Sequence, residues 1–455
     1  MTRRELLALS SGLISVTSVQ AQRERADPPK GSPSDSPTTP ADITLHIVEM
    51  DLEVAPGHLV RTKAYNGQVP GPVLRLAAGK SISVDVINET DDPEIVHWHG
   101  FHIPSDVDGA PEAGTPMVQG HDRRRYTFTP NPLGTRWYHA HAMAGHSLKR
   151  GTYTGQFGIA IIEAGNSPAP YDMEAPILLH EWDPFFSSDM AMDVDYTLFS
   201  INGKMLGAAE PIRVKRSQRL LFRFVNCSAT MQHRLALAGH AFQVIALDGN
   251  EIIKPVTVPV VEMAPGERID AIVEMDNPGV WILGEEDDRQ RLGGAGIVVE
   301  YAGATGGPKW VKPEPFLWDY PAFGGNSSSP QPDATVRLVF EPRHDGNMWA
   351  INGKSFPDTD PFFVRSGARN RLVFDNRSEM SHPVHLHRHT FELTRFAGRR
   401  TSGVFKDVVL VPDRSVVEAD LIANAPGPSL FHCHQQFHMD FGFMAVMEYK
   451  GVPSA

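Results

Sequence analysis

The sequence has 455 residues, too many for one ordinary hydrophobic core, and its length indicates about three domains. Apolar residues make up 41% of it and the mean hydropathy is −0.25, which is typical of a soluble globular protein. The formal net charge is −12 and no basic block follows the first residues, so the composition argues against binding to nucleic acid. Short apolar runs among 39 glycines and 37 prolines indicate mostly β structure.

The first residues have the pattern of an export signal. Arg3 and Arg4 precede an apolar run, and Val19-Gln20-Ala21 is typical of a cleavage site. We expect residues 1–21 to be this signal; the arginine pair favours the twin-arginine type, with an ordinary secretory signal as the alternative. Residues 22–41 are rich in proline and polar residues and predict a flexible linker. The protein would be periplasmic or secreted, without a membrane span after signal removal.

An internal repeat divides the rest of the chain. Each unit opens on Asn-Gly, at positions 66, 202 and 352, and continues in a strand-like stretch that ends in Asn88, Asn226 or Asn376. Each unit closes on a similar glycine turn: NPLGTRWYHAH (131–141), NPGVWILGEE (277–286) and NAPGPSLFHCH (424–434). We therefore predict three β-sandwich domains of one design, at 42–165, 166–305 and 306–450.

The first unit holds two histidine pairs, His97-Trp98-His99 and His139-Ala140-His141. Successive side chains of a strand point to opposite faces, so each His-x-His pair places two imidazoles on one face. Such a pair can bind one metal ion or two neighbouring ions. A single pair would be a weak signal, because many histidines are ordinary surface or core residues.

The middle unit keeps the pattern of the repeat without these ligands. It has Gly284-Glu285-Glu286 where the first unit has its second histidine pair. Its stretch QHRLALAGHAF (232–242) aligns with SHPVHLHRHTF (381–391), with alanines in place of His385 and His387. We expect the two histidines of this stretch, His233 and His240, to be structural. Cys227 ends a strand-like stretch, and we expect it to be a small apolar core residue.

The third unit holds two more clusters, His382-Pro383-Val384-His385-Leu386-His387 and His432-Cys433-His434 with His438. On a strand, His432 and His434 would project to one face and Cys433 to the other. The three residues would then serve two metal sites that are joined through the backbone of Cys433. A cysteine with two histidines is typical of a blue copper centre. Zinc would explain one such site, but not eleven ligands in this layout.

Together the four clusters resemble the copper motifs of the multicopper oxidases, a laccase-like family of three cupredoxin domains. The resemblance covers about residues 42–450, including YNGQVPGPVLR (65–75). It implies an all-β fold of three cupredoxin-like Greek-key β-sandwich domains, and copper as the cofactor, with one type 1, one type 2 and two type 3 ions per chain. By position, the implied ligands are His382, Cys433 and His438 for type 1; His97 and His385 for type 2; and His99, His139, His141, His387, His432 and His434 for type 3.

The resemblance also implies a mechanism. A reductant gives single electrons to the type 1 copper, and dioxygen is reduced to water at a cluster between the first and third domains. Water formation consumes protons, so a carboxyl group near the cluster is expected. Asp108 occupies the position of such an acid in related oxidases; a loop residue that only forms a turn is the alternative. Some relatives have a glutamate where this chain has Met439, and Asp440, the next residue, is our second candidate.

The sequence leaves the reductant open. Phenols or aromatic amines are one class, and Cu(I) or Fe(II) is the alternative, weakly indicated by Met190 and Met192 in SSDMAMDVDY (187–196). A copper-free structural protein of the same fold is a third hypothesis, which the complete ligand set disfavours. A copper nitrite reductase is disfavoured because its blue-site cysteine lacks the two-sided His-Cys-His bridge. We expect a monomer, whose partners are dioxygen and the reductant.

Two residues near the ligands depart from, or refine, the resemblance. Relatives commonly have glycine at the position of Arg388, so the surroundings of that loop are uncertain from sequence. In the family that the chain resembles, the residue five places after the second type 1 histidine lies on the axial side of the copper. From His438 that residue is Phe443, and Met444, one place further, should face away along a strand. A one-residue slip would exchange the two. Because phenylalanine donates nothing to copper, we expect a high reduction potential.

Overall fold

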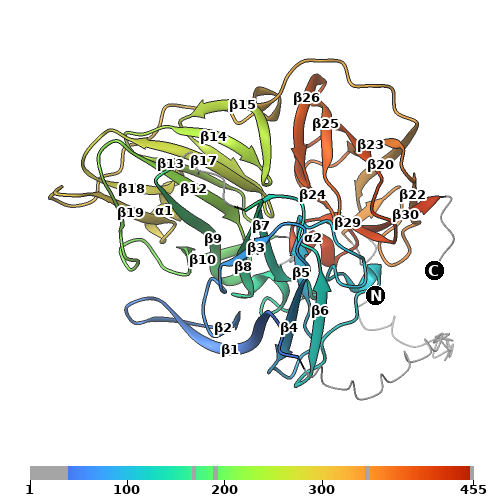
Figure 1. Cartoon of the computed structure of the whole chain (residues 1–455), viewed down its shortest axis with the longest axis horizontal. Coiled ribbons are helices and arrows are strands. Elements are labelled where there is room, and N and C mark those ends of the chain that lie inside the picture. The colour runs from blue at the N-terminus through green and yellow to red at the C-terminus, as the bar shows by residue number, and fades with distance from the viewer. Residues whose placement is uncertain (1–38, 166–170, 188–192, 344–347, 451–455) are drawn as a thin grey trace, which may run out of the picture. The chain divides into compact units, whose positions relative to one another are not determined.

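The computed structural model describes residues 39–165, 171–187, 193–343 and 348–450. The predicted export signal lies outside these residues, as do nearly all of the predicted linker and both Met190 and Met192. Residues 41–455 form one compact unit. Its strands belong to six sheets, which follow one another along the chain in three pairs, blue to red in Figure 1. The fold is therefore all-β, as predicted, and consists of three cupredoxin-like sandwiches.

The first sandwich pairs the sheet β2-β1-β4-β6 with the sheet β3-β8-β7-β5. Along β4 every second residue is buried, as expected for a strand with one face on a core. The two sheets enclose one apolar core that includes Trp98 and Tyr138. The elements are β1 (Ile43–Ala55), β2 (His58–Tyr65), β3 (Leu74–Ala77), β4 (Ile82–Asn88), β5 (Val96–His99), η1 (Pro111–Ala113), β6 (Arg123–Phe128), β7 (Gly134–Ala140), η2 (Gly151–Tyr153) and β8 (Phe157–Glu163).

The second sandwich pairs the sheet β10-β9-β12-β17-β14-β15 with the sheet β11-β19-β18-β13-β16. Its elements are β9 (Met173–Phe186), β10 (Val194–Ile201), β11 (Ile212–Val214), β12 (Gln218–Asn226), β13 (His233–Leu237), β14 (Phe242–Leu247), β15 (Asn250–Val258), β16 (Val261–Met263), β17 (Arg268–Met275), β18 (Val280–Glu285), α1 (Asp288–Leu292) and β19 (Gly296–Tyr301). The 3-10 helix η3 (Tyr320–Phe323) lies in the connection to the third sandwich.

The third sandwich repeats this order of strands, with the sheets β21-β20-β23-β28-β25-β26 and β22-β30-β29-β24-β27. Its elements are β20 (Ala334–Pro342), β21 (Trp349–Ile351), β22 (Phe362–Arg365), β23 (Arg369–Asn376), β24 (His382–Leu386), β25 (Phe391–Phe396), β26 (Arg399–Lys406), β27 (Val408–Val411), β28 (Val416–Ile422), β29 (Ser429–Cys433), α2 (Gln436–Asp440) and β30 (Met444–Lys450). The predicted boundaries at 42–165, 166–305 and 306–450 remain a proposal, which this pairing of sheets supports.

The Asn-Gly pairs form the same turn in all three sandwiches. Asn66, Asn202 and Asn352 have φ values of 54°, 53° and 53°, and the glycine after each also has positive φ. Asparagine and glycine tolerate this left-handed backbone at the lowest cost. The side-chain oxygen of each asparagine accepts a hydrogen bond from a neighbouring strand, at His46, Leu178 and Val339.

The asparagines that end the long strands of the repeat also share one role. Asn88, Asn226 and Asn376 are buried, and each donates its amide to carbonyls of the following loop. Each accepts a hydrogen bond from the backbone two residues further on. The loop that follows each of these strands is thus fixed by equivalent hydrogen bonds in all three sandwiches.

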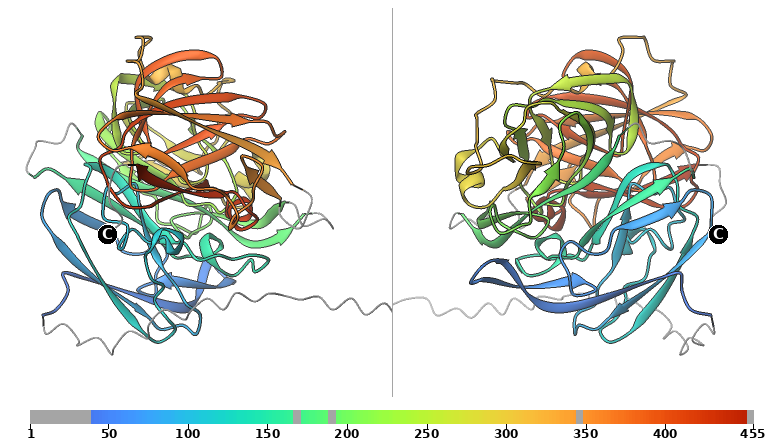
Figure 2. Two further views of the ribbon diagram at one scale, coloured as in Figure 1. Left: turned by 90° about the vertical axis from the view of Figure 1, so that its right-hand side faces the viewer. Right: turned by 60° about the vertical axis from the view of Figure 1, so that its left-hand side comes forward.

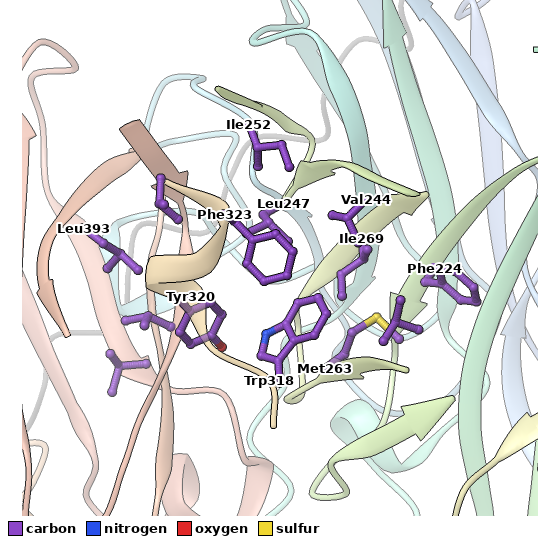
Figure 3. Close-up of a cluster of buried hydrophobic side chains, with 14 of the residues drawn as sticks. Phe224, Val244, Leu247, Ile252, Met263, Ile269, Trp318, Tyr320, Phe323 and Leu393 are labelled. Carbon is purple, nitrogen blue, oxygen red and sulfur yellow. The ribbon is translucent and has the colours of Figure 1, made fainter. Parts of the chain in front are cut away.

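The second and third sandwiches share one apolar core. Trp318, Tyr320 and Phe323 come from the connection between them and are buried together. Figure 3 shows these rings between Leu247 and Ile269 of the second sandwich and Leu393 of the third. The green-to-yellow and orange-to-red strands lie side by side in Figure 1, and in both views of Figure 2 one set lies in front of the other. Among the described residues, no helix has the length and apolar character needed to cross a membrane.

Candidate metal centre

A cysteine and two histidines of the third sandwich converge on one point. Cys433 comes from the end of β29, His382 from the start of β24 and His438 from α2. The Cys433 Sγ lies 3.8 Å from His382 Nδ1 and 3.5 Å from His438 Nδ1, and the two nitrogens are 3.2 Å apart. All three side chains are buried. One sulfur and two imidazole nitrogens, all within the reach of one ion, form a donor set that fits copper.

The surroundings fix this geometry. The Ser378 hydroxyl lies 2.9 Å from His382 Nε2, so that Nδ1 of the same ring faces the sulfur. Burial raises the pKa of the Cys433 thiol, and a cation bound to the sulfur would offset that effect by stabilising the thiolate. Burial lowers the pKa of His438 to about 3, which keeps this imidazole neutral and able to bind metal.

Aromatic rings enclose the three ligands. The Trp349 ring lies 4.4 Å from the His382 ring and 4.6 Å from the His438 ring, between centroids. The Phe443 ring is 4.9 Å from that of His382. Met444 packs instead in a separate apolar cluster with Leu430 and Met439. The structure thus places Phe443 on the ligand side and Met444 away from it, the arrangement expected from the sequence.

Eight further histidines form one buried cluster between the first and third sandwiches. Each sandwich supplies four: His97, His99, His139 and His141 from β5, β7 and the residue after it; His385, His387, His432 and His434 from β24, β29 and the residues after them. These strands lie near one another and near α2 in Figure 1. The cluster therefore exists only when the two sandwiches pack together.

The imidazole nitrogens meet across this interface. His97 Nε2 lies 3.4 Å from His385 Nε2, which is the pair implied for type 2 copper. His141 Nε2 lies 3.4 Å from His432 Nε2, which in turn is 3.0 Å from His387 Nε2. On the other side, His99 Nδ1 is 3.3 Å from His139 Nε2. The structure brings together all eight histidines that the sequence predicted for the cluster.

The outward nitrogens of the cluster are held by hydrogen bonds. His97 Nδ1 donates to the backbone oxygen of Asp108 and His385 Nδ1 to that of Asp407, both at 2.8 Å. His139 and His432 donate to neighbouring carbonyls in the same way. Metal-binding histidines almost always have such a partner, which fixes the tautomer and leaves the other nitrogen free for the metal.

Three buried nitrogens in the cluster have no hydrogen-bond partner among the described residues. They are His434 Nδ1, His434 Nε2 and His141 Nδ1. Buried polar atoms are normally satisfied, so these need a ligand such as a metal ion or water. Burial, together with repulsion between neighbouring imidazoles, lowers the pKa of the cluster histidines, which keeps them neutral. The residues present therefore fit copper.

Asp108 lies at the edge of this cluster. Its Oδ2 accepts a hydrogen bond from His387 Nδ1 at 2.8 Å, while Oδ1 is buried with no partner and lies 3.8 Å from His97 Nδ1. Burial raises the pKa of Asp108 to about 8, opposed by the positive charge of Arg388. Asp440 has different contacts: it accepts hydrogen bonds from the amides of Ala144 and Gly145 and from Gln436. It thus ties α2 to the first sandwich.

The sequence did not point to Asp407. This residue follows β26, and its Oδ1 lies 3.1 Å from His99 Nε2. Arg268 of the middle sandwich donates to both carboxylate oxygens of Asp407, at 2.5 and 2.6 Å. A lone aspartate in a strand-rich stretch carries no motif, so only the three-dimensional arrangement reveals its place beside the cluster.

Gly266 is a second contribution of the middle sandwich. It has φ +87°, and a Cβ on it would lie 2.7 Å from His434 Cδ2. Only glycine fits this close approach without displacing the histidine. The sandwich without a candidate copper site therefore still shapes the cluster.

Comparison with known proteins gives a consistent result. Multicopper oxidase families match at residues 47–167, 181–300 and 329–451. The multicopper oxidase MmcO of Mycobacterium tuberculosis is 29% identical over 97% of this chain and 92% of its own length. A laccase of Trametes maxima is 26% identical over 85% of this chain and 89% of its own length. The crystal structure of a multicopper oxidase from Pseudomonas thermotolerans has a TM-score of 0.72 at 26% identity, covering 90% and 100% of the two chains.

Proposed function

Because the chain belongs to the multicopper oxidase family, a copper-dependent class of oxidoreductase, we propose that it oxidises phenols or aromatic amines and reduces dioxygen to water. His382, Cys433 and His438 would hold the type 1 copper. His97 and His385 would hold the type 2 copper, and the other six cluster histidines the type 3 pair. Bound copper would supply one-electron transfer at the mononuclear site and dioxygen reduction at the cluster. The convergence of eleven donors on two adjoining sites, with His434 placed by its ring contacts to His99 and His139, is the observation that supports this function.

Cys433 would connect the two sites. Its side chain faces His382 and His438, while the residues before and after it in the chain belong to the cluster. An electron that reaches the sulfur therefore has a covalent path of one residue to either His432 or His434. The buried ligands exclude bulk water, which limits escape of partly reduced oxygen.

The aromatic substrate class is supported by the surroundings of His438. The helix that carries this residue also carries Phe437 and is followed by Phe441, and their rings are 4.7 Å apart. The exposed His146 lies 4.7 Å from the Phe441 ring, and the partly exposed Phe186 lies 5.6 Å from that of Phe437. Phe437 is buried, and the rings of His146, Phe186 and Phe441 around it offer an aromatic reductant a partly exposed surface for stacking.

The alternative is an oxidase for Cu(I) or Fe(II). It is supported by Met380, a thioether that is 39% exposed two residues before His382. Against it, His382 Nε2 meets the hydroxyl of Ser378, and among the described residues no carboxylate lies within hydrogen-bonding distance of His382 or His438. A hard ion such as Fe(II) would need oxygen ligands at this edge, so we favour the aromatic class.

Protons for water formation would come through Asp108. Its Oδ1 is buried without a hydrogen-bond partner beside His97, and Oδ2 is fixed by His387, so the free oxygen can hold a proton at the edge of the cluster. We keep Asp440 as a second proposed proton group. Its oxygens accept hydrogen bonds from Gln436, Ala144 and Gly145, which are the contacts of an anchor between α2 and the first sandwich.

We also propose that the chain is exported, by a twin-arginine signal at residues 1–21, and acts as a monomer in the periplasm or outside the cell.

The test of the substrate class is a steady-state comparison with the purified enzyme. Oxidation of 2,6-dimethoxyphenol, Cu(I) and Fe(II) should be compared by dioxygen uptake. A higher kcat/KM for the phenol supports the proposal, and a clear preference for either metal ion supports the alternative.

A further inference from the structure

Arg388 stands directly after the cluster ligand His387, in a backbone conformation that suits glycine. Its φ is +64°, in the left-handed region that a long side chain rarely adopts. The residue is nevertheless buried. A buried arginine in a strained conformation indicates that its side chain supplies contacts which glycine could not.

The guanidinium binds two segments besides its own. Its Nε donates to the backbone oxygen of Ile103 at 2.7 Å, in the loop of the first sandwich that runs from His99 to Asp108. Both Nη atoms donate to the segment that leads into β29, and these acceptors are the carbonyls of Ala425, Pro426, Gly427 and Pro428 and the hydroxyl of Ser429. Every guanidinium nitrogen therefore has an acceptor.

All of these acceptors are neutral. Within the described residues, no carboxylate lies within ion-pair distance of the Arg388 guanidinium. A buried charge normally has a charged partner, since desolvation is otherwise costly. The planar fork of arginine offsets that cost here through hydrogen bonds to carbonyl oxygens in fixed directions, which a flexible lysine cannot reproduce.

The bound segments are those that carry the cluster. The first one ends at Asp108, whose backbone oxygen accepts from His97 and whose carboxylate accepts from His387. The second one continues into His432, Cys433 and His434. Thr390, two residues after Arg388, adds another contact to the first segment, because its hydroxyl lies 3.0 Å from His102 Nε2.

We propose that Arg388 is a positioning residue for the copper cluster. Its guanidinium fixes the position of the loop before Asp108 and of the segment before His432. Both are held relative to the strand that carries His385. This inference rests on the proposed function. The pair His97–His385 would suffer most from its loss, because His97 is held by the backbone oxygen of Asp108 at the end of the first bound loop, while His385 lies on the strand that leads to Arg388.

The test compares Arg388→Gly and Arg388→Lys with a matched control, Arg414→Gly. Arg414 also has positive φ, +48°, but its side chain is 67% exposed and pairs with the exposed Glu379. For each copper-loaded variant, the blue absorption and the type 2 electron paramagnetic resonance signal are followed while a chelator removes copper. Thermal unfolding of the copper-free chains is measured alongside.

For both Arg388 variants we expect copper affinity at the type 2 position to fall about 10–100-fold, with the blue absorption retained. We also expect a lower Tm for copper-free Arg388→Gly than for wild type. Arg414→Gly should match wild type or unfold at a higher temperature, since glycine relieves the backbone there. If Arg388→Gly does not fold, Arg388→Lys carries the test.

Three results would overturn the inference. The first is an unchanged type 2 signal in Arg388→Gly. The second is a lower Tm of Arg388→Gly with no change in its copper affinity. The third is full retention of type 2 copper in Arg388→Lys, which would make charge alone sufficient. A wild-type chain with neither a blue band nor a type 2 signal after copper loading would instead contradict the proposed function.

Discussion

His233 Nδ1 lies 3.1 Å from Glu285 Oε2 in the middle sandwich, at the strand positions that His382 and Cys433 occupy in the third. The register is the same in both. Glu285 pairs with the residue two places after His233, and Cys433 pairs with the residue two places after His382. A short helix of five residues follows in each, α1 and α2, with Gln290 in the position of His438. The middle sandwich thus keeps the scaffold of the mononuclear site.

A protonated imidazole takes the place of a metal in this scaffold. Glu181 Oε1 lies 2.6 Å from His233 Nε2, where the third sandwich has the hydroxyl of Ser378. Burial alone would lower the pKa of His233, but the carboxylates of Glu181 and Glu285 raise it to about 10. Both nitrogens of the ring face a carboxylate, so neither is free to bind copper.

The first prediction concerns copper content. Replacing His233 and His240 together by glutamine should leave the amount of copper per chain unchanged, because His233 sits between carboxylates and His240 bonds Ala238 and Tyr301. Metal analysis of the purified variant, with His385→Gln as the control that should lose copper, checks this. Loss of an ion from the double variant would reveal a site in the middle sandwich.

The same network predicts a pH-dependent loss of stability. Breaking a buried ion pair costs about 3–5 kcal/mol, so His233→Gln should be less stable than wild type. The folded pKa of about 10 exceeds the unfolded value of about 6.5, so the imidazolium stabilises the fold fully below pH ~6.5 and less as pH rises towards 10. Denaturant unfolding at several pH values should show that the difference in free energy of unfolding between wild type and His233→Gln becomes smaller as pH rises. A difference that stays constant with pH would contradict this prediction.

The sequence predicted the ligands better than their supports. His-x-His spacing and the repeat comparison located all eleven candidate donors, because the strand alternation that orients them is local. Asp407, Arg268 and Gly266 went unnoticed, since each acts across an interface between sandwiches and has no pattern along the chain. The same limit applies to Arg388, which looked only like a departure from a familiar motif until its acceptors were known.

The fold shows a similar division. Three sandwiches followed from the recurring Asn-Gly turns and strand-end asparagines, which make local hydrogen bonds. The aromatic connection through Trp318, Tyr320 and Phe323 could not be predicted, because those residues fill a space that only the packing of two sandwiches defines. Interface packing is a long-range property, and no short stretch of sequence determines it.

The third prediction concerns Cys433. Cys433→Ser should abolish the blue absorption and substrate oxidation, because the sulfur is the only soft donor among the three ligands. The fold and the cluster coppers should persist, as the cluster has its own eight histidines. Cys227→Ala is the matched control: Cys227 is also buried but lies in the core near Trp182, and its removal should leave the blue band intact. Near-normal oxidase activity in Cys433→Ser would refute the assignment.

The fourth prediction separates the two halves of the reaction. Asp108→Asn removes the free carboxylate oxygen at the cluster but leaves the mononuclear site untouched. Anaerobic bleaching of the blue band by a phenol should proceed at the wild-type rate, while reoxidation by dioxygen slows about 10²-fold or more. Asp106→Asn, in the same loop but exposed, should change neither rate. Slow bleaching in Asp108→Asn would place the residue in substrate oxidation instead.

The last prediction concerns the strength of the oxidant. The Phe443 ring lies 4.9 Å from the His382 ring and 6.0 Å from that of Trp349, so an apolar side chain stands beside the candidate type 1 ligands. Without a thioether there, reduced copper would be favoured, and we expect a high reduction potential. Phe443→Met should lower the potential, and each 100 mV corresponds to about 2.3 kcal/mol of driving force for one electron. Phenol oxidation should slow accordingly while the blue colour persists.

Redox titration decides between the two neighbours in the chain: Met444 packs with Leu430 and Met439, so Met444→Leu should leave the potential unchanged. A shift in Met444→Leu, with none in Phe443→Met, would show that Met444 is the axial residue.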